Sequence, residues 1–244
     1  MASILLVHGA WMGGWAWDRV APILRARGHQ VSAPDLLGYG AGDPPAGEVT
    51  RPAAIERLRD ELTSMPGPVV VVGHSLGGTV ISELAEAAPE SVSVLVYVAA
   101  YLLGDGQSVS EVSGSMQEFW TSALAADGAI QVLAEQGGTV VNPDMAVDAF
   151  VADADADDQA WAAGLMHLDP FAYGGTPLRL TDARWGSVRR VYVETLDDHA
   201  VPVAAQRAMH TAHSVDQVHQ IKSSHTPMIA HAGELADLLG RIAG

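Results

Sequence analysis

Apolar residues along the chain fall into two alternating patterns. In the first, short runs of consecutive apolar residues, many of them β-branched, are of strand rather than helix length. Consecutive apolar positions are expected where helices cover both faces of a parallel sheet. The predicted strands are Ile4–Val7, His29–Ala33, Val69–Val72, Val92–Ala99, Val188–Glu194 and Gln217–Ile221.

The second pattern consists of longer stretches with helical periodicity, which lie between the short runs. The predicted helices are Trp15–Arg27, Pro52–Met65, Leu76–Ala88, Val203–His213 and Pro227–Ile242. Strands that alternate with helices in this way predict an α/β fold with a doubly wound, mostly parallel sheet. We assign residues 1–102 and 188–244 to this α/β core.

Residues 103–187 interrupt the alternation. This segment has no clear strand pattern and is rich in Ala, Asp and Gln, so we predict a mostly helical cap insertion over the carboxyl edge of the sheet. A loose linker is the alternative, but the segment has too many aromatic residues for one: Phe119, Trp120, Trp161, Phe171, Tyr173 and Trp185. Its acidic stretch, residues 153–158, lacks the Gly and terminal Glu of a calcium loop and is interpreted as a solvated helix start.

Composition narrows the function. The 13 Lys and Arg residues face 29 Asp and Glu residues, and a net charge of −16 disfavours binding to nucleic acid or an anionic membrane surface. The chain has no cysteine, which excludes disulfides, a thiolate nucleophile and a Cys-based metal site. The start of the chain does not resemble a signal peptide, and the longest apolar stretch is shorter than the ~20 residues of a membrane span. We expect a cytoplasmic protein.

The segment Gly73-His74-Ser75-Leu76-Gly77 carries the clearest chemical signal, because it follows four valines and opens a predicted helix. It matches G-x-S-x-G, in which a serine occupies a sharp strand-to-helix turn that exposes its hydroxyl at the top of the sheet. An ordinary glycine-rich turn is the alternative interpretation. The valine run before the motif favours a serine nucleophile at Ser75.

A serine hydroxyl is a weak nucleophile until a base takes its proton. In this architecture the partners follow in the order serine, acid, histidine. His225 comes just after the last predicted strand, at the same end of the sheet as Ser75, and is the predicted base. The acid should follow the penultimate strand, where Asp198 is preferred to Asp197; Asp105 is the candidate if the acid follows the strand that ends near Ala99.

Two backbone N–H groups are needed to stabilise a developing oxyanion. One is expected from Leu76, the residue after the nucleophile. The other is expected from the loop after the first strand, where Gly9 allows a close approach of the backbone and Ala10 is the predicted donor.

These motifs resemble the plant methyl esterase and hydroxynitrile lyase branch of the α/β-hydrolases and its bacterial esterase-like members. The likeness is carried by the segments 5–17, 73–78, 198–202 and 225–228, and it covers about two-thirds of the chain. It implies a small helical cap over an apolar pocket, no cofactor and often a dimer. It also implies the same triad of Ser75, Asp198 and His225, with Ala10 and Leu76 as oxyanion donors.

The sequence departs from the lyases of this branch at two positions. Those lyases have a threonine after the first histidine and a lysine directly after the catalytic histidine, where this chain has Gly9 and Thr226. We therefore predict an esterase that acts on a small to medium, largely apolar ester through an acyl-enzyme. The alternatives are carbon–carbon cleavage as in hydroxynitrile lyases, and a ligand-binding receptor on the same fold.

No metal or cofactor is predicted, and the expected partner is the small-molecule ester. The tryptophans Trp11, Trp120, Trp161 and Trp185 are candidates for lining the substrate pocket. Each tryptophan of the insertion has core packing between cap elements as its alternative role.

Overall fold

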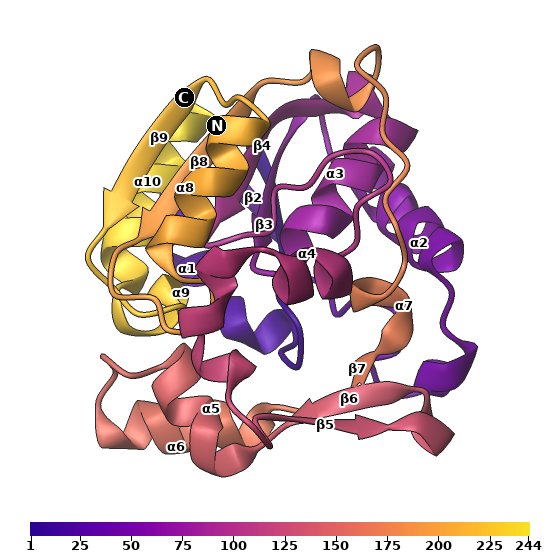
Figure 1. Ribbon diagram of the computed structural model, residues 1–244. Helices are drawn as coiled ribbons and strands as arrows, with labels where there is room; N and C mark the ends of the chain where they lie inside the picture. The colour runs from indigo at the N-terminus through magenta and orange to yellow at the C-terminus, as the bar shows by residue number, and fades with distance from the viewer.

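One parallel sheet forms the centre of the molecule. The computed structural model describes residues 1–244, and its main sheet has the strand order β2-β1-β3-β4-β8-β9 with every neighbouring pair parallel (Figure 1). The strands are β1 (Ser3–Val7), β2 (Gln30–Ser32), β3 (Val69–His74), β4 (Val92–Val98), β8 (Arg190–Thr195) and β9 (Gln217–Ile221). Each end lies within two residues of its predicted position. The predicted fold class is confirmed.

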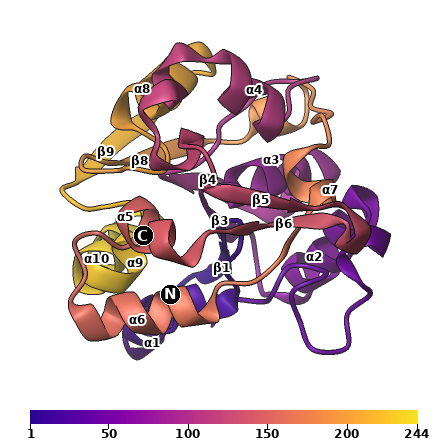
Figure 2. The ribbon, with the colours of Figure 1, turned by 60° about the horizontal axis from the view of Figure 1, so that its bottom comes forward.

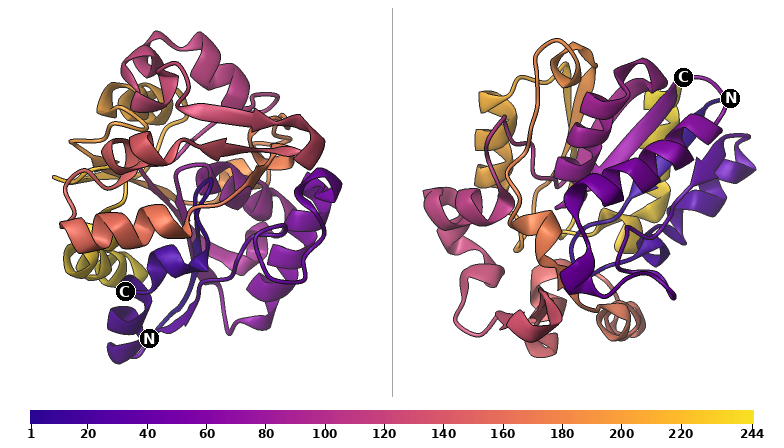
Figure 3. Two further views of the ribbon diagram at one scale, coloured as in Figure 1. Left: turned by 90° about the horizontal axis from the view of Figure 1, so that it is seen from below. Right: turned by 90° about the vertical axis from the view of Figure 1, so that its right-hand side faces the viewer.

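Helices cover both faces of this sheet. Helices α1 and α10 pack together on one face, and α2, α3 and α8 lie on the other (Figure 3). Their bounds are α1 (Val20–Ala26), α2 (Arg51–Ser64), α3 (Gly77–Ala87), α8 (Val203–Ala212) and α10 (Ala232–Ala243). Strand β3 is therefore buried at every position, which accounts for its unbroken run of valines.

Two predicted helices are each divided in the structure. The first consists of a 3₁₀ turn, η1 (Gly14–Trp17), followed by α1. Separately, a 3₁₀ turn, η2 (Ala46–Glu48), precedes α2. The last consists of α9 (Pro227–Ala230) and α10, because the backbone leaves helical geometry at His231, with φ −120° and ψ 33°. No helix of the structure is both long enough and apolar enough to span a bilayer.

The cap lies between β4 and β8 and extends over the carboxyl edge of the sheet (Figures 1 and 2). The prediction that this segment lacks strands is wrong, because it contains a three-stranded antiparallel sheet in the order β5-β6-β7. These strands have two to four residues, and β5 is mostly exposed, so they produce none of the apolar runs that mark the core strands. The cap elements are α4 (Val109–Ser115), η4 (Gln117–Thr121), η5 (Ala123–Ala125), β5 (Ile130–Leu133), η6 (Ala134–Gln136), β6 (Gly138–Val141), α5 (Pro143–Phe150), α6 (Ala156–Leu165), β7 (Asp169–Pro170) and α7 (Phe171–Gly174).

After α7 the chain leaves the cap and runs back beside α3 toward the amino edge of the sheet (Figure 1). The backbone N–H of Thr181 donates to Glu86 at 2.9 Å, and Arg184 donates to the Ala87 carbonyl at 2.8 Å. The 3₁₀ turn η7 (Trp185–Ser187) follows and leads into β8. Only the part of the predicted insertion up to about residue 175 therefore lies over the carboxyl edge.

Candidate active site

Ser75 occupies the turn between β3 and α3 with φ +52°, in the left-handed region that non-glycine residues rarely adopt. The glycines on either side are required by close contacts. A Cβ on Gly73 would lie 2.7 Å from the Gly77 carbonyl oxygen, and one on Gly77 would lie 2.6 Å from the His8 carbonyl oxygen. The G-x-S-x-G spacing thus follows from the packing of the turn against the end of β1.

Two backbone N–H groups flank Ser75 and have no acceptor within the protein. They belong to Leu76 and Ala10, and both residues line the same pocket as Ser75. Ala10 precedes Trp11, a second non-glycine residue in the left-handed region, with φ +59°. The Ala10 loop therefore presents a free donor next to the serine, as an oxyanion site requires.

His8 shapes this loop from beneath. Its Nδ1–H donates to the Gly9 carbonyl at 2.8 Å, and its Nε2 accepts from the Leu36 backbone N–H at 3.0 Å. Burial lowers the pKa of His8 to about 4, so the ring is neutral at physiological pH. A neutral ring is what the second hydrogen bond needs, because a protonated imidazole has no acceptor.

Asp198 and His225 lie in direct contact. The His225 Nδ1–H donates to Asp198 Oδ2 at 2.8 Å, and both side chains are fully buried. Asp198 Oδ1 also accepts the N–H groups of Ala200 and Val201, at 2.8 Å each. Gln206 donates to Asp198 Oδ2 at 3.1 Å. These bonds fix the carboxylate, and the carboxylate in turn fixes the tautomer of the imidazole.

The opposite ring nitrogen of His225, Nε2, has no hydrogen-bond partner in the protein. His74 packs against the His225 ring with 4.6 Å between centroids, and its Nε2–H donates to the His225 carbonyl at 2.9 Å. Burial lowers the pKa of His74 well below its usual value, which keeps this second ring neutral. His74 therefore supports His225 from the residue that precedes Ser75.

The loop that carries His225 is also tied to the cap. The backbone N–H of Ser224 donates to Asp153 Oδ2 in the cap at 2.8 Å. Thr226 Oγ1 donates to the Phe150 carbonyl at 2.6 Å. The two neighbours of His225 are thus held by the end of α5 and the turn after it.

The two other acid candidates lie elsewhere. Asp197 is exposed, and its backbone N–H donates to the Ser223 carbonyl. Asp105 is also exposed, and its carboxylate accepts the Leu180 N–H at 2.9 Å. Of the three carboxylates considered, the structure brings only Asp198 to His225.

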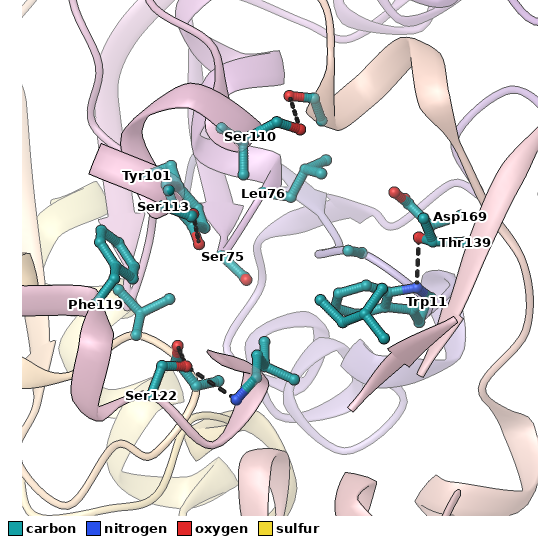
Figure 4. Close-up of a pocket in the computed structure, with 18 of the residues that line it drawn as sticks. Trp11, Ser75, Leu76, Tyr101, Ser110, Ser113, Phe119, Ser122, Thr139 and Asp169 are labelled. Atoms are coloured by element: carbon teal, nitrogen blue, oxygen red, sulfur yellow. Dashed lines mark hydrogen bonds between the residues drawn. The ribbon is translucent and has the colours of Figure 1, made fainter. Parts of the chain in front are cut away.

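A pocket of about 480 Å³ opens above Ser75, between the sheet and the cap. Most of its lining residues are hydrophobic, and they come from both layers. Figure 4 shows Ser75 between two groups of lining residues, with Tyr101, Ser113 and Phe119 on one side and Trp11, Thr139 and Asp169 on the other. Such a volume suits a small to medium ligand.

Of the four tryptophans predicted to line the pocket, only Trp11 does so. Trp120 is 66% exposed on the cap surface. Trp161 packs edge-on against Trp15 of η1, with 5.2 Å between ring centroids, and does not line the pocket. Trp185 lies at the amino end of β8, where its Nε1–H donates to the Tyr97 hydroxyl at 3.1 Å. The candidate roles of Trp120, Trp161 and Trp185 are corrected accordingly.

Several pocket residues were not predicted from the sequence, and Asp169 is the most unusual of them. It is 5% exposed, lines the pocket and accepts a hydrogen bond from the Tyr39 hydroxyl at one of its two oxygens. Burial raises the pKa of Asp169 to about 7, and the bond from Tyr39 opposes this only in part. Its sequence context, an Asp before a Pro in a segment expected to be helical, gave no signal of a pocket residue.

The acidic stretch of the cap has structural contacts. Asp155 caps α6 by accepting the Asp158 N–H at 2.9 Å, and Asp158 pairs with Arg19. Nowhere do three or more His, Asp or Glu side chains gather in a way that could hold a metal ion.

The fold and this arrangement define the class. A parallel α/β sheet with a serine on its strand-to-helix turn, and a histidine–aspartate pair after later strands, is the architecture of an α/β hydrolase. The chain belongs to that family, since the protein-family model with the description "Alpha/beta hydrolase family" matches residues 4–238.

Known relatives agree with the predicted branch, which is confirmed. "Putative methylesterase 11, chloroplastic" of Arabidopsis thaliana is 32% identical over 98% of this chain, and the chain spans 63% of its length. "Methyl jasmonate esterase 1" of Vitis vinifera is 30% identical, with 98% of this chain and 95% of the relative covered. The crystal structure of a pyrethroid hydrolase from Sphingobium faniae superposes with a TM-score of 0.90 at 30% identity, covering 99% of this chain and 97% of that one.

Proposed function

We propose that this protein is a carboxylic ester hydrolase that uses Ser75 as nucleophile and forms an acyl-enzyme. The observation that carries the proposal is a serine in a strained turn that shares one pocket with two free backbone N–H groups. The Asp198–His225 pair is held next to it, because the His225 ring packs on His74, the residue that precedes Ser75. The relatives named as methylesterases and as a pyrethroid hydrolase support the same reaction class.

In the first half-reaction, Ser75 Oγ attacks the ester carbonyl carbon while its proton passes to His225 Nε2, the nitrogen without a partner. The negative charge on the carbonyl oxygen is stabilised by the N–H groups of Ala10 and Leu76. The carbon–oxygen bond to the alcohol then breaks, and the alcohol leaves with the proton held by His225. Asp198 stabilises the imidazolium form throughout.

In the second half-reaction, water attacks the acyl-enzyme carbonyl and gives a proton to His225. Collapse of the tetrahedral intermediate breaks the bond to Ser75 Oγ and returns that proton to the serine. The products are a carboxylic acid and the free enzyme, and no further reactant is needed. The mostly hydrophobic pocket favours a largely apolar ester.

Hydroxynitrile cleavage has less support. The chain contains a single lysine, Lys222, and its side chain is exposed at the end of β9 rather than in the pocket. Thr226 occupies the position after His225, but its hydroxyl is engaged by Phe150. Neither residue supplies the positive charge that a departing cyanide would require.

The test is a panel of p-nitrophenyl and methyl esters of increasing acyl length, assayed with the wild type and Ser75→Ala. We expect turnover by the wild type and loss of it in Ser75→Ala, down to the residual ~10³–10⁴-fold advantage over water that the remaining site provides. Ser64→Ala, on the exposed face of α2, is the matched control and should retain wild-type rates. A fluorophosphonate probe should add its mass to the peptide that contains Ser75. Wild-type rates in Ser75→Ala would disprove the assignment.

A further inference from the structure

One corner of the pocket is polar and has no part in the proposed reaction. Thr139 of β6 and Asp169 of β7 are register partners in an antiparallel pair, so their side chains lie on the same face of the cap sheet. Both line the pocket, and Figure 4 shows them beside Trp11, across from Tyr101 and Phe119. The corner therefore faces the space that a bound substrate would occupy.

Each residue of this corner retains hydrogen-bonding capacity. Asp169 Oδ1 accepts from the Tyr39 hydroxyl, while Oδ2 has no partner in the protein. Thr139 Oγ1 accepts from Trp11 Nε1 at 3.1 Å, and its own hydroxyl proton has no acceptor in the protein. The corner thus offers one acceptor and one donor side by side.

A purely structural role does not account for this arrangement. A residue that served only to hold Tyr39 would need one acceptor atom and no place in the pocket lining. A carboxyl group in a mostly apolar cavity carries a desolvation cost, which the raised pKa of Asp169 reflects. That cost is offset when a ligand satisfies the second oxygen.

We propose that Thr139 and Asp169 form a subsite for a hydroxyl group carried by the ester substrate. A hydroxyl matches both residues through one oxygen atom: it accepts a hydrogen bond from Thr139 and donates one to Asp169 Oδ2. An ether or a ketone satisfies only one of the two. This inference rests on the proposed esterase function and narrows its substrates to hydroxylated esters.

The experiment compares matched esters that differ by one hydroxyl. One series consists of p-nitrophenyl 3-phenylpropanoate and its 3- and 4-hydroxyphenyl analogues, and the other of 2-phenylethyl acetate and its 2-, 3- and 4-hydroxyphenyl analogues. The readout is the ratio of kcat/KM for each hydroxylated ester to that for its parent, at pH 8.5, where the Asp169 carboxyl is ionised. We expect at least one ratio on the order of tenfold, as one hydrogen bond to a charged group provides.

Variants of Thr139 and Asp169 test whether these two residues cause the higher kcat/KM of the hydroxylated ester. Asp169→Leu and Thr139→Val should each bring it below about threefold, which is the loss of most of that one bond, while Thr139→Ser, which retains the hydroxyl, should preserve it. Asp127→Asn is the matched control, because Asp127 is an exposed aspartate of the same cap without hydrogen-bond partners, and it should leave the ratio at the wild-type value. A structural role alone would lower the rates for both members of a pair equally and leave the ratio unchanged. Thr139→Val decides the question if Asp169→Leu fails to fold.

The outcomes separate the two proposals. Ester turnover that disappears in Ser75→Ala establishes the reaction regardless of the ratio. The subsite is overturned if no hydroxylated ester is preferred, or if the preference survives in both Asp169→Leu and Thr139→Val. Calorimetric Kd values of Ser75→Ala for each pair test the subsite without turnover, and equal Kd values within every pair would also overturn it.

Discussion

The two walls of the pocket are built in different ways. The core wall places Ser75, Leu76 and Ala10 at the ends of strands in a sheet that is buried on both faces. The cap wall consists of short helices and strands, some with exposed large hydrophobic side chains such as Trp120 and Val132. One wall is fixed by backbone packing and the other by a small number of side-chain contacts.

This difference indicates that the core wall and the cap wall have different functions. Positions on the core wall are set by close backbone approaches, such as that of Gly77 to His8, which allow almost no variation. The cap wall is joined to the core by individual bonds, including the one from His167 N–H to the Trp11 carbonyl at 3.0 Å. We therefore expect changes in the core wall to abolish the chemistry, and changes in the cap wall to alter selectivity or stability.

The largest effect is expected at Asp198. Asp198→Asn should reduce kcat by on the order of 10⁴-fold, because an amide cannot stabilise the imidazolium and favours the wrong tautomer of His225. The measurement is steady-state ester hydrolysis, with the exposed Asp197→Asn as the matched control at wild-type activity. A strong loss in Asp197→Asn with a normal Asp198→Asn would transfer the role of the acid to Asp197.

Trp185→Ala tests whether a tryptophan from the predicted insertion acts through packing alone. Its ring is buried, donates to Tyr97 and is covered by the Arg190 guanidinium at 4.5 Å. We expect a loss of about 3–5 kcal/mol in the free energy of unfolding, measured by urea denaturation, with an unchanged order of preference among esters of different length. A shift in that preference would contradict its position away from the pocket.

Asp169 should make the free energy of unfolding of the protein depend on pH. Its pKa is about 7 in the folded protein against an ordinary value of 3.8, so the folded state holds a proton that the unfolded state releases between these values. Stability contributed by the protonated group is complete below pH 4 and declines as pH rises to about 7. Relative to Asp169→Asn, the wild type should lose on the order of 3–4 kcal/mol between pH 4 and pH 8. A difference between the two proteins that stays constant with pH would contradict the prediction.

The smallest effect on stability and ester preference is expected for substitution of Trp120. Substitution of its neighbour Phe119 should have a much larger effect on ester preference. Phe119 is 3% exposed, lines the pocket and stacks on Tyr101, with 5.4 Å between centroids. Phe119→Ala should change the preference between short and long esters by about tenfold. Trp120→Ala should change the free energy of unfolding by less than ~0.5 kcal/mol and leave the preference between short and long esters unchanged. Equal changes in preference for the two variants would show that exposure does not distinguish these neighbours.

The sequence predicted the core far better than the cap. Buried parallel strands leave runs such as the valines before Ser75, and the elbow motif combines a strained turn with two forced glycines, so both could be recognised locally. Asp198 is preferred to Asp197 because it stands four residues before Pro202, the residue that directly precedes α8. The β5-β6-β7 sheet left no apolar run, because its strands are short and partly exposed.

The pocket lining could not be predicted, because it depends on which way each side chain of an irregular segment points. Phe119 and Trp120 are adjacent in one 3₁₀ turn, yet one is buried and the other exposed. Asp169 enters the pocket through its pairing with Thr139, a contact between strands that were not expected to exist. Size and aromatic character favoured the tryptophans, whereas three-dimensional placement favoured smaller residues.

The bonds from Ser224 and Thr226 to the end of α5 have a consequence for protein engineering. They join the loop of His225, the proposed general base, to the cap through Asp153 and the Phe150 carbonyl. In a chimera that receives the cap of a relative, the hydrogen bonds from the cap to the two neighbours of His225 would therefore change. Domain grafting on this scaffold should succeed only when the junction includes both partners of these two bonds.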